Sequence, residues 1–262
     1  MTAVTSKDNE IIKLARKLSL SKKHRYENGM FLLEGLRICT DAVNENADIS
    51  CILVSESAYE KNSEALAAII EKSRRLCIIT DELSEYISDT SSTQGIFGIC
   101  KMLDKRKDFS KINNMGTYVV LVGIQDTGNL GTVIRTADAM GLTAVITVNC
   151  CDLYNPKTIR STMGSLFRMT VIDGDIEQVF GTLRQADIKT YAAVIDDDAA
   201  SVTECSFKKD RGKAIFIGNE GNGLPREVVD MCDCKVTIRM CGSVNSLNAA
   251  SAASILMWEL VR

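Results

Sequence analysis

The side chains best suited to binding or chemistry lie in loops beside expected strands and helices. The first loop, residues 125–131, follows an apolar strand and leads into a helix that carries Arg135. Its glycines permit a tight turn, but the Lys-Ser/Thr ending of a P-loop and the Gly-x-Gly-x-x-Gly pattern are absent. The amide of Asn129 and the guanidinium of Arg135, near the carboxyl end of a strand, suit a polyanionic or hydroxyl-bearing ligand.

Further loops offer glycines, hydroxyl groups and one carboxylate. Residues 157–165 are rich in hydroxyl groups, which suits either a ligand-lining turn or a capped helix start. Residues 218–224 follow a strand and contain three glycines, which leave backbone N–H groups accessible. Glu220 in that loop disfavours a phosphate ligand because like charges repel, and it favours a cation or a hydroxyl donor. Residues 238–248 lead into an Ala- and Ser-rich helix, which suits either a packed core helix or a pocket-forming helix start.

The composition excludes several classes of site. The single histidine, His24, excludes multi-His metal sites and argues against a Ser-His-Asp triad. None of the ten cysteines forms a Cys-x-x-Cys pair, and most lie in apolar runs, so we expect reduced, buried thiols and a cytoplasmic protein. No apolar segment follows Met1 and no run reaches membrane-spanning length, so neither secretion nor a membrane is expected.

Basic residues are concentrated in two stretches although the formal net charge is −3. Residues 1–37 hold eight Lys or Arg residues against four acids, and residues 101–111 hold five against two. Both stretches could contact phosphates, and the alternative is that they are solvated helix faces.

The hydrophobic pattern indicates two α/β units. In the first unit we expect helices and strands at these positions: helices 9–20, 32–44, 58–74 and 81–87, strands 51–55, 76–80 and 95–102. In the second unit we expect strands and helices as follows: strands 117–124, 143–148, 190–195, 214–217 and 235–240, helices 131–140, 176–186 and 246–261. Near-continuous apolar strands that alternate with helices imply a mainly parallel sheet, in which ligands bind at the carboxyl ends of strands.

Three segments together resemble the SpoU (TrmH-type) family of RNA 2′-O-ribose methyltransferases, in the SPOUT superfamily. Residues 126–131 with 135–138 are similar to the first motif of that family, and residues 160–165 resemble the second. Residues 218–224 with 246–248 resemble the third. The N-terminal half resembles the family's substrate-binding domain, with matches at Phe31-x-x-Glu34-Gly35 and Gln94-Gly95.

The resemblance implies a C-terminal SPOUT-type parallel sheet with a trefoil knot, plus a smaller N-terminal α/β RNA-binding domain. It places the substrate-binding domain at residues 1–105, a linker at 106–116 and the methyltransferase domain at 117–262. It also implies bound S-adenosylmethionine, an RNA substrate and a homodimer with the site near the interface. Ribosomal RNA is the preferred substrate, and transfer RNA is the alternative.

Site residues follow from the motif positions. The resemblance assigns catalytic or site-shaping roles to Asn129, Arg135, Glu220, Ser246 and Asn248. It assigns cofactor binding to Gly218, Asn219, Gly221, Ile238, Met240 and Leu247. No metal is implied. Arg135 is expected to position the ribose hydroxyl and the adjacent phosphate, because a guanidinium stays protonated and is a poor general base.

Parts of the sequence are also compatible with two other functions. A non-catalytic RNA-binding or ribosome-assembly factor is suggested by Arg239 and Met169, which replace prolines that are common in relatives. A nucleotide-dependent oxidoreductase is suggested only by strand, glycine loop and helix patterns, and it lacks the dinucleotide fingerprint. The intact set of Asn129, Arg135 and Asn248 favours the methyltransferase.

Overall fold

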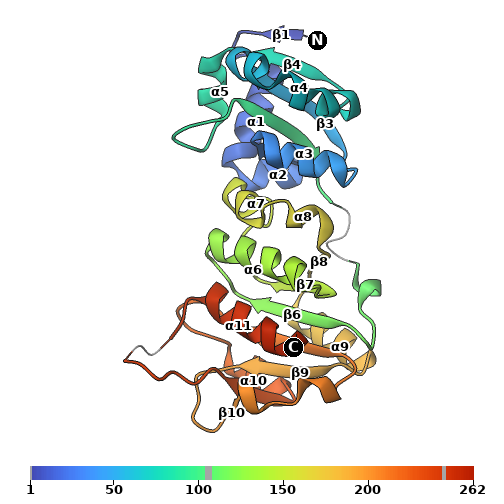
Figure 1. Cartoon of the computed structure of the whole chain (residues 1–262), viewed down its shortest axis with the longest axis vertical. Helices are drawn as coiled ribbons and strands as arrows, with labels where there is room; N and C mark the ends of the chain where they lie inside the picture. Colours follow the sequence, from blue (N-terminus) through green and yellow to red (C-terminus); the bar gives the residue numbers. More distant parts are fainter. Residues whose placement is uncertain (1, 104–107, 244–245) are drawn as a thin grey trace. The chain divides into compact units, whose positions relative to one another are not determined.

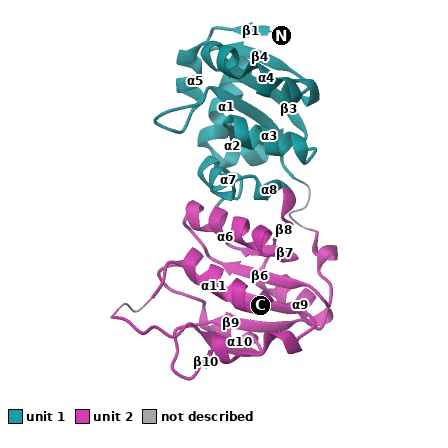
Figure 2. Ribbon diagram, in the orientation of Figure 1, with its two compact units in different colours: residues 1–103, 152–167 teal, residues 104–151, 168–262 magenta. Residues whose placement is uncertain are grey.

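The computed structural model describes residues 2–103, 108–243 and 246–262, and the chain divides into two compact units. Unit 1 consists of residues 1–103 and 152–167, and unit 2 consists of residues 104–151 and 168–262 (Figure 2). Each unit has its own sheet and its own hydrophobic core. The α/β class expected from the sequence is therefore confirmed for both units.

Unit 1 is built on a five-stranded mixed sheet (Figure 1). Its strands are β1 (Thr2–Val4), β2 (Met30–Glu34), β3 (Ile49–Ser55), β4 (Leu76–Ile79) and β5 (Ile96–Lys101). Its helices are α1 (Glu10–Leu20), α2 (Lys22–Asn28), α3 (Leu36–Asn44), α4 (Glu56–Lys72), α5 (Asp81–Ile87) and α7 (Pro156–Thr162), with α8 (Ser165–Arg168) at the boundary to unit 2. The strand order is β1–β4–β3–β5–β2, in which β5 runs antiparallel to both of its neighbours.

The helix predicted for residues 32–44 is wrong over its first residues. Met30–Glu34 forms strand β2, which pairs antiparallel with β5, and helix α3 begins only at Leu36. Gly35 separates the two elements with a φ of +113°, a conformation that favours glycine. A short buried run such as Phe31–Leu33 has no periodicity that distinguishes a strand from a helix, which explains the error.

Unit 2 contains a seven-stranded sheet in which all the pairings are parallel. Its strands are β6 (Thr117–Val122), β7 (Ala144–Val148), β8 (Val171–Asp173), β9 (Lys189–Ala193), β10 (Ala200–Ser201), β11 (Lys213–Ile217) and β12 (Cys234–Thr237). Its helices are α6 (Thr127–Ala139), α9 (Ile176–Gln185), α10 (Arg226–Met231) and α11 (Ala249–Val261), with 3-10 turns η2 (Phe109–Lys111), η3 (Val202–Glu204) and η4 (Phe207–Lys209). The strand order is β10–β12–β9–β11–β6–β7–β8. The five predicted strands are present, whereas the short strands β8 and β10 had no signal in the sequence.

Residues 152–167 leave unit 2 and pack within unit 1 (Figure 2). Asp152 accepts hydrogen bonds from Arg25 Nε at 2.8 Å and from the Tyr26 hydroxyl at 3.0 Å, and Arg25 is only 2% exposed. The ring of Tyr154 lies 4.6 Å from that of Phe31, centroid to centroid. The sequence analysis assigns residues 117–262 to one domain, whereas in the structure residues 152–167 belong to unit 1.

Two expected absences concern membranes and disulfides. No described helix combines the length and the apolar composition that crossing a lipid bilayer requires. All ten cysteines are free thiols, and burial raises the pKa of the Cys100 thiol to about 12. Four of these thiols, at Cys39, Cys51, Cys77 and Cys100, are buried and behave as small hydrophobes, whereas the other six are partly or fully exposed, which differs from the expectation of buried thiols.

Candidate active site

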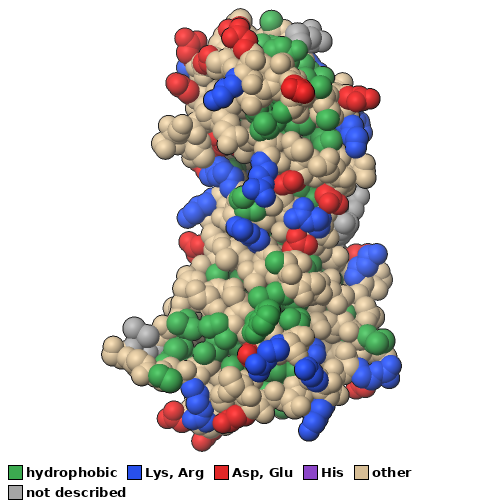
Figure 3. All heavy atoms as spheres, in the orientation of Figure 1, with side chains coloured by type: hydrophobic (Ala, Val, Ile, Leu, Met, Phe, Trp, Pro, Cys, Tyr) green, Lys and Arg blue, Asp and Glu red, His purple; other side chains and the backbone are tan. Residues whose placement is uncertain are grey.

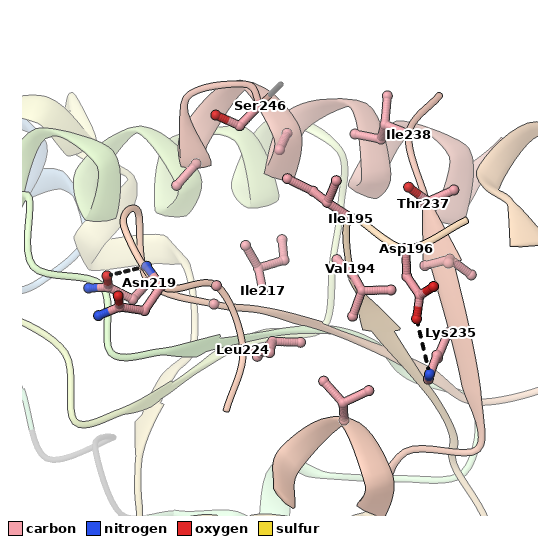
Figure 4. Close-up of a pocket in the computed structure, with 18 of the residues that line it drawn as sticks. Val194, Ile195, Asp196, Ile217, Asn219, Leu224, Lys235, Thr237, Ile238 and Ser246 are labelled. Carbon is pink, nitrogen blue, oxygen red and sulfur yellow. Dashed lines mark hydrogen bonds and ion pairs between the residues drawn. The ribbon is translucent and has the colours of Figure 1, made fainter. Parts of the chain in front are cut away.

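A cavity of about 670 Å³ opens at the carboxyl ends of β9, β11 and β12 in unit 2 (Figure 4). Its walls are largely apolar and include Val194, Ile217, Leu224, Ile238 and Leu247. Ligands bind at this edge of open parallel sheets, and small-molecule sites measure roughly 300–1,000 Å³. The cavity is therefore placed and sized to hold a nucleoside-sized ligand.

The turn after β11 forms one wall of the cavity, and its shape depends on glycine. A Cβ atom at Gly218 would lie 2.1 Å from the backbone carbon of Gly223, so no other residue fits without moving the chain. Asn219 and Gly223 exchange backbone hydrogen bonds of 3.1 and 2.9 Å across the turn. The Asn219 side chain donates to the carbonyl oxygen of Gly123 at 2.8 Å, which ties the turn to the end of β6.

A chain of side-chain hydrogen bonds joins three segments that are far apart in the sequence. Asn129 Nδ2 donates to Glu220 Oε1 at 3.0 Å, and Asn248 Nδ2 donates to Asn129 Oδ1 at 3.0 Å. Asn248 also caps α11, because its Oδ1 accepts from Ala250 N at 2.9 Å. We refer to Glu220, Asn129 and Asn248 as the polar chain.

Helix α6 starts where its capping residue allows. Asp126 Oδ1 accepts from the backbone N–H of Asn129 at 2.8 Å, which satisfies a donor of the first turn. The helix therefore begins at Thr127, four residues before the predicted start at residue 131. This early start places Asn129 in the first turn, where its side chain bonds to Glu220 and Asn248 in the polar chain.

Glu220 is held by donors that favour its charged form. Burial raises the pKa of this carboxyl group, but hydrogen bonds from Asn129 and from the backbone N–H groups of Gln125 and Asp126 outweigh burial, so the pKa lies below its usual value. The N–H of Gln125 donates to Oε2 at 3.3 Å, and that of Asp126 donates to Oε1 at 3.2 Å. Glu220 thus connects the turn after β11 to the start of α6 as an acceptor.

The structure brings most of the predicted site residues together. Those that line the cavity are Gly218, Asn219, Glu220, Gly221, Ile238, Met240, Ser246 and Leu247. Asn129 and Asn248 reach the cavity through their hydrogen bonds to Glu220 and to each other.

Arg135 is the exception. It is exposed, it does not line the cavity, and its side chain makes no hydrogen bond or ion pair with the rest of the described chain. Asn129 and Arg135 are six residues apart on α6, so at about 100° per residue they point to different sides of the helix. Within one chain the Arg135 side chain therefore lies apart from the cavity, and its role beside Asn129 stays a prediction.

Several lining residues were not anticipated. Ile195 and Asp196 follow β9, and Asp196 Oδ2 forms an ion pair with Lys235 Nζ at 3.1 Å (Figure 4). The signal that could have found them is positional, because they follow a predicted strand at the edge where ligands bind. Among the described residues, no group of three or more His, Cys, Asp or Glu is arranged to hold a metal ion.

Residues of the second motif and of the N-terminal motifs form hydrogen bonds within unit 1. Arg160 donates to the largely buried Glu34 at 3.3 Å, and the Ser88 hydroxyl donates to the same carboxylate at 2.5 Å. Gln94 Oε1 accepts from Leu36 N at 3.0 Å and so caps α3, which has no other side-chain cap. These residues hold the loop before β5 against the end of β2.

The expected basic surfaces are only partly open to solvent. Lys17, Lys22 and Lys23 are exposed on α1 and α2, whereas Arg25 is buried. Figure 3 shows Lys and Arg side chains gathered on unit 1 around α2 and α7. In the predicted cluster at 101–111, residues 105–107 lie outside the described part of the chain.

Two known domain families match the chain. Residues 116–258 match the family described as "SpoU rRNA Methylase family", and residues 9–98 match the "MRM3-like substrate binding domain".

Full-length relatives and solved structures show the same likeness. The chain is 28% identical to the "23S rRNA (guanosine(2553)-2'-O)-methyltransferase RlmP" of Bacillus subtilis, over 99% of each protein. It is 27% identical to a "23S rRNA (uridine(2479)-2'-O)-methyltransferase" of Streptomyces viridochromogenes, over 92% of this chain and 86% of the relative. An AdoMet-bound rRNA methyltransferase from Sinorhizobium meliloti superimposes with a TM-score of 0.88 at 28% identity, over 99% of this chain and 97% of that one. The S. viridochromogenes methyltransferase AviRb in complex with AdoMet superimposes with a TM-score of 0.85 at 25% identity, over 97% of each chain.

Proposed function

The chain belongs to the SpoU rRNA methylase family, and from this premise we propose that it transfers a methyl group from S-adenosylmethionine to a ribose 2′-hydroxyl of ribosomal RNA. The observation that carries the proposal is the polar chain, which joins Asn129, Glu220 and Asn248 beside the cavity. Relatives of similar length bear names that state this reaction on 23S rRNA.

The cavity suits the cofactor in size and in charge. S-adenosylmethionine carries a sulfonium, an ammonium and a carboxylate, and is therefore a net cation. The lining holds three carboxylates, Asp196, Glu220 and Asp230, against two cations, Arg226 and Lys235. Apolar walls with few polar groups are typical of cofactor sites. When bound, the cofactor supplies the electrophilic methyl group.

The protein's part in the reaction is to position and to stabilise. Glu220 holds the Asn129 amide by accepting its hydrogen bond, and Asn129 in turn accepts from Asn248. The fixed amides and the Ser246 hydroxyl can orient the ribose for an in-line attack. Arg135 pairs with the RNA phosphate next to the target ribose and stabilises the charge that develops on the 2′-oxygen.

We infer a homodimer, and the position of Arg135 together with an exposed apolar surface supports it. Helices α6 and α11 pack against each other, and α11 exposes Ile255 and Trp258, which are 40% and 56% exposed. Figure 3 shows hydrophobic side chains gathered over α11 on this face of unit 2. A second copy that covers this surface buries the apolar side chains and brings a free Arg135 towards a cavity.

A trefoil knot is supported by the strand order. β12 lies between β9 and β10, so the connection from β9 to β10 must cross the end of β12. After β12 the chain returns as α11, which packs against β6, β11, η3 and η4. We infer that the C-terminal segment passes through the loop formed by this crossing. We also infer a cytoplasmic location from the RNA substrate and the ten free thiols.

RNA binding is assigned to unit 1, where residues 9–98 match the substrate-binding family. The exposed lysines of α1 and α2 supply phosphate contacts. Replacing Lys17, Lys22 and Lys23 together with glutamate is expected to weaken rRNA binding and to leave affinity for the cofactor unchanged. Deletion of these helices is not a usable test, because Ile12 and Leu18 lie in the core of unit 1.

The reaction is tested by methyl transfer to RNA. Purified protein with labelled S-adenosylmethionine is expected to label ribosomal RNA at one ribose, which is mapped as a 2′-O-methyl nucleotide. Arg135→Ala is expected to lower the rate by about 10²–10³ and to leave cofactor affinity unchanged. Wild-type protein that binds the cofactor but labels neither ribosomal nor transfer RNA would refute the proposal, and labelling of transfer RNA alone would refute the substrate.

A further inference from the structure

The cavity has a second polar end, formed by Asp196 and Lys235. Their side chains, 36% and 44% exposed, form an ion pair at 3.1 Å. Figure 4 shows Asn219 and Asp196 on opposite sides of Ile217, so this pair lies across the cavity from the turn that carries Glu220.

Asp196 is held in place and still has acceptor capacity. Its Oδ1 accepts from the backbone N–H of Asp198 at 3.0 Å, and its Oδ2 accepts from Lys235. The backbone hydrogen bond from Asp198 and the contact with Lys235 lower the pKa of Asp196, so the group is ionised. An ionised carboxylate offers about four acceptor sites, of which two are used here.

Asp196 follows a strand next to the strand that ends in the glycine turn, which is where a ribose acceptor lies in dinucleotide-binding sheets. β9 is the direct neighbour of β11, and β11 ends in the glycine turn at residues 218–223. In dinucleotide-binding sheets an acid near the strand ends accepts the ribose hydroxyls beside a glycine-rich turn. The preceding Ile195 lines the same cavity and is 75% exposed, so its apolar side chain is accessible to a ligand that enters beside Asp196.

We propose that Asp196 binds the ribose diol of the adenosine half of S-adenosylmethionine, and that Lys235 acts as a positioning residue for its carboxylate. The inference rests on the proposed function. The diol is favoured over the ammonium group because Lys235 already neutralises Asp196 and would repel a second cation. Neutral hydroxyl groups need only the acceptor sites that remain.

The test compares ligands that differ only in ribose hydroxyls, by isothermal titration calorimetry with the full chain. The probes are S-adenosylhomocysteine and its 2′-deoxy and 3′-deoxy counterparts. Wild-type protein is expected to bind at least one deoxy ligand about tenfold more weakly or worse, because a hydrogen bond to a charged acceptor is lost. Asp196→Ala is expected to bind S-adenosylhomocysteine about tenfold more weakly and to discriminate less than about threefold between the probes.

Asp197→Ala is the matched control, because Asp197 is exposed and does not line the cavity. Its discrimination is expected to equal that of the wild type. A further probe, 5′-methylthioadenosine, keeps the ribose and lacks the amino-acid group, so Asp196→Ala is expected to weaken it by the same factor.

Three results would overturn the inference. The first is that the wild type binds both deoxy ligands within twofold of its affinity for S-adenosylhomocysteine. The second is that Asp196→Ala discriminates between the probes as strongly as the wild type, and the third is that Asp196→Ala loses affinity only for ligands that carry the amino-acid group. The first measurement needs no variant and so does not depend on how a variant folds. Failure of the wild type to bind S-adenosylhomocysteine at all would instead overturn the proposed function together with this inference.

Discussion

Replacement of Glu220 by glutamine tests whether the polar chain organises the site. Glu220 Oε1 accepts from Asp126 N and Asn129 Nδ2, and Oε2 accepts from Gln125 N. Glutamine replaces one acceptor oxygen with an NH₂ donor. In either orientation of the amide, at least one N–H group of the α6 start then faces a donor.

The magnitude follows from the lost contacts. A hydrogen bond to a charged group contributes about 1.5–3 kcal/mol, but water can replace part of it at an exposed side chain, so we expect about 1 kcal/mol of lost stability. The effect on rate is larger, because a displacement of about 1 Å in a positioned group can cost roughly 10²-fold. Glu220→Gln is therefore expected to lower methyl transfer by about 10²-fold with a small change in Tm.

The pH dependence of stability provides a second readout. The folded pKa of Glu220 lies below its ordinary value of 4.5, so its stabilising contribution is present above that value and is lost as the pH falls through the folded pKa. The difference in Tm between wild type and Glu220→Gln should be full at neutral pH and should narrow below pH 4.5.

Glu227→Gln is the matched control, because Glu227 is an exposed carboxylate on α10 that does not line the cavity. It should match the wild type in rate and in Tm. The reasoning fails if Glu220→Gln retains the wild-type rate, or if its Tm difference from wild type does not depend on pH.

Three further substitutions address other parts of the molecule. Gly218→Ala should destabilise the protein by about 1–3 kcal/mol in urea denaturation and weaken cofactor binding in calorimetry, because the added Cβ would clash with the backbone of Gly223. Gly221→Ala is the control and should keep wild-type stability, because its Cβ would lie 3.5 Å from the nearest atom, Asn219 Oδ1. Arg25→Met leaves Asp152 buried without its cation and should cost about 3–5 kcal/mol in urea denaturation; a loss under 1 kcal/mol would contradict the burial argument. Trp258→Glu should dissociate the proposed dimer in sedimentation, whereas Leu20→Glu, which alters another exposed apolar residue, should not.

Residue type and local spacing were sufficient to predict the central strands and the turns of the site. Buried apolar runs in unit 2 indicate strands directly, and glycine at 218 and capping residues such as Asp126 act within a few residues of their own position. Errors occurred where the local pattern is ambiguous, as for Met30–Glu34, or where an element is as short as β10.

Long-range packing settled the remaining features, since they depend on contacts between residues far apart in the chain. Asn129 is hydrogen-bonded to Glu220, 91 residues away in the sequence, and to Asn248, 119 residues away. A local sequence pattern cannot predict contacts between residues so far apart in the chain. Packing likewise leaves Arg135 exposed and outside the lining of its own cavity, places residues 152–167 in unit 1 and pairs Asp196 with Lys235. The sequence thus specified which turns could bind a ligand. The folding of the parallel sheet selected which side chains share the resulting site, because the strand order alone decides which strands have neighbouring carboxyl ends.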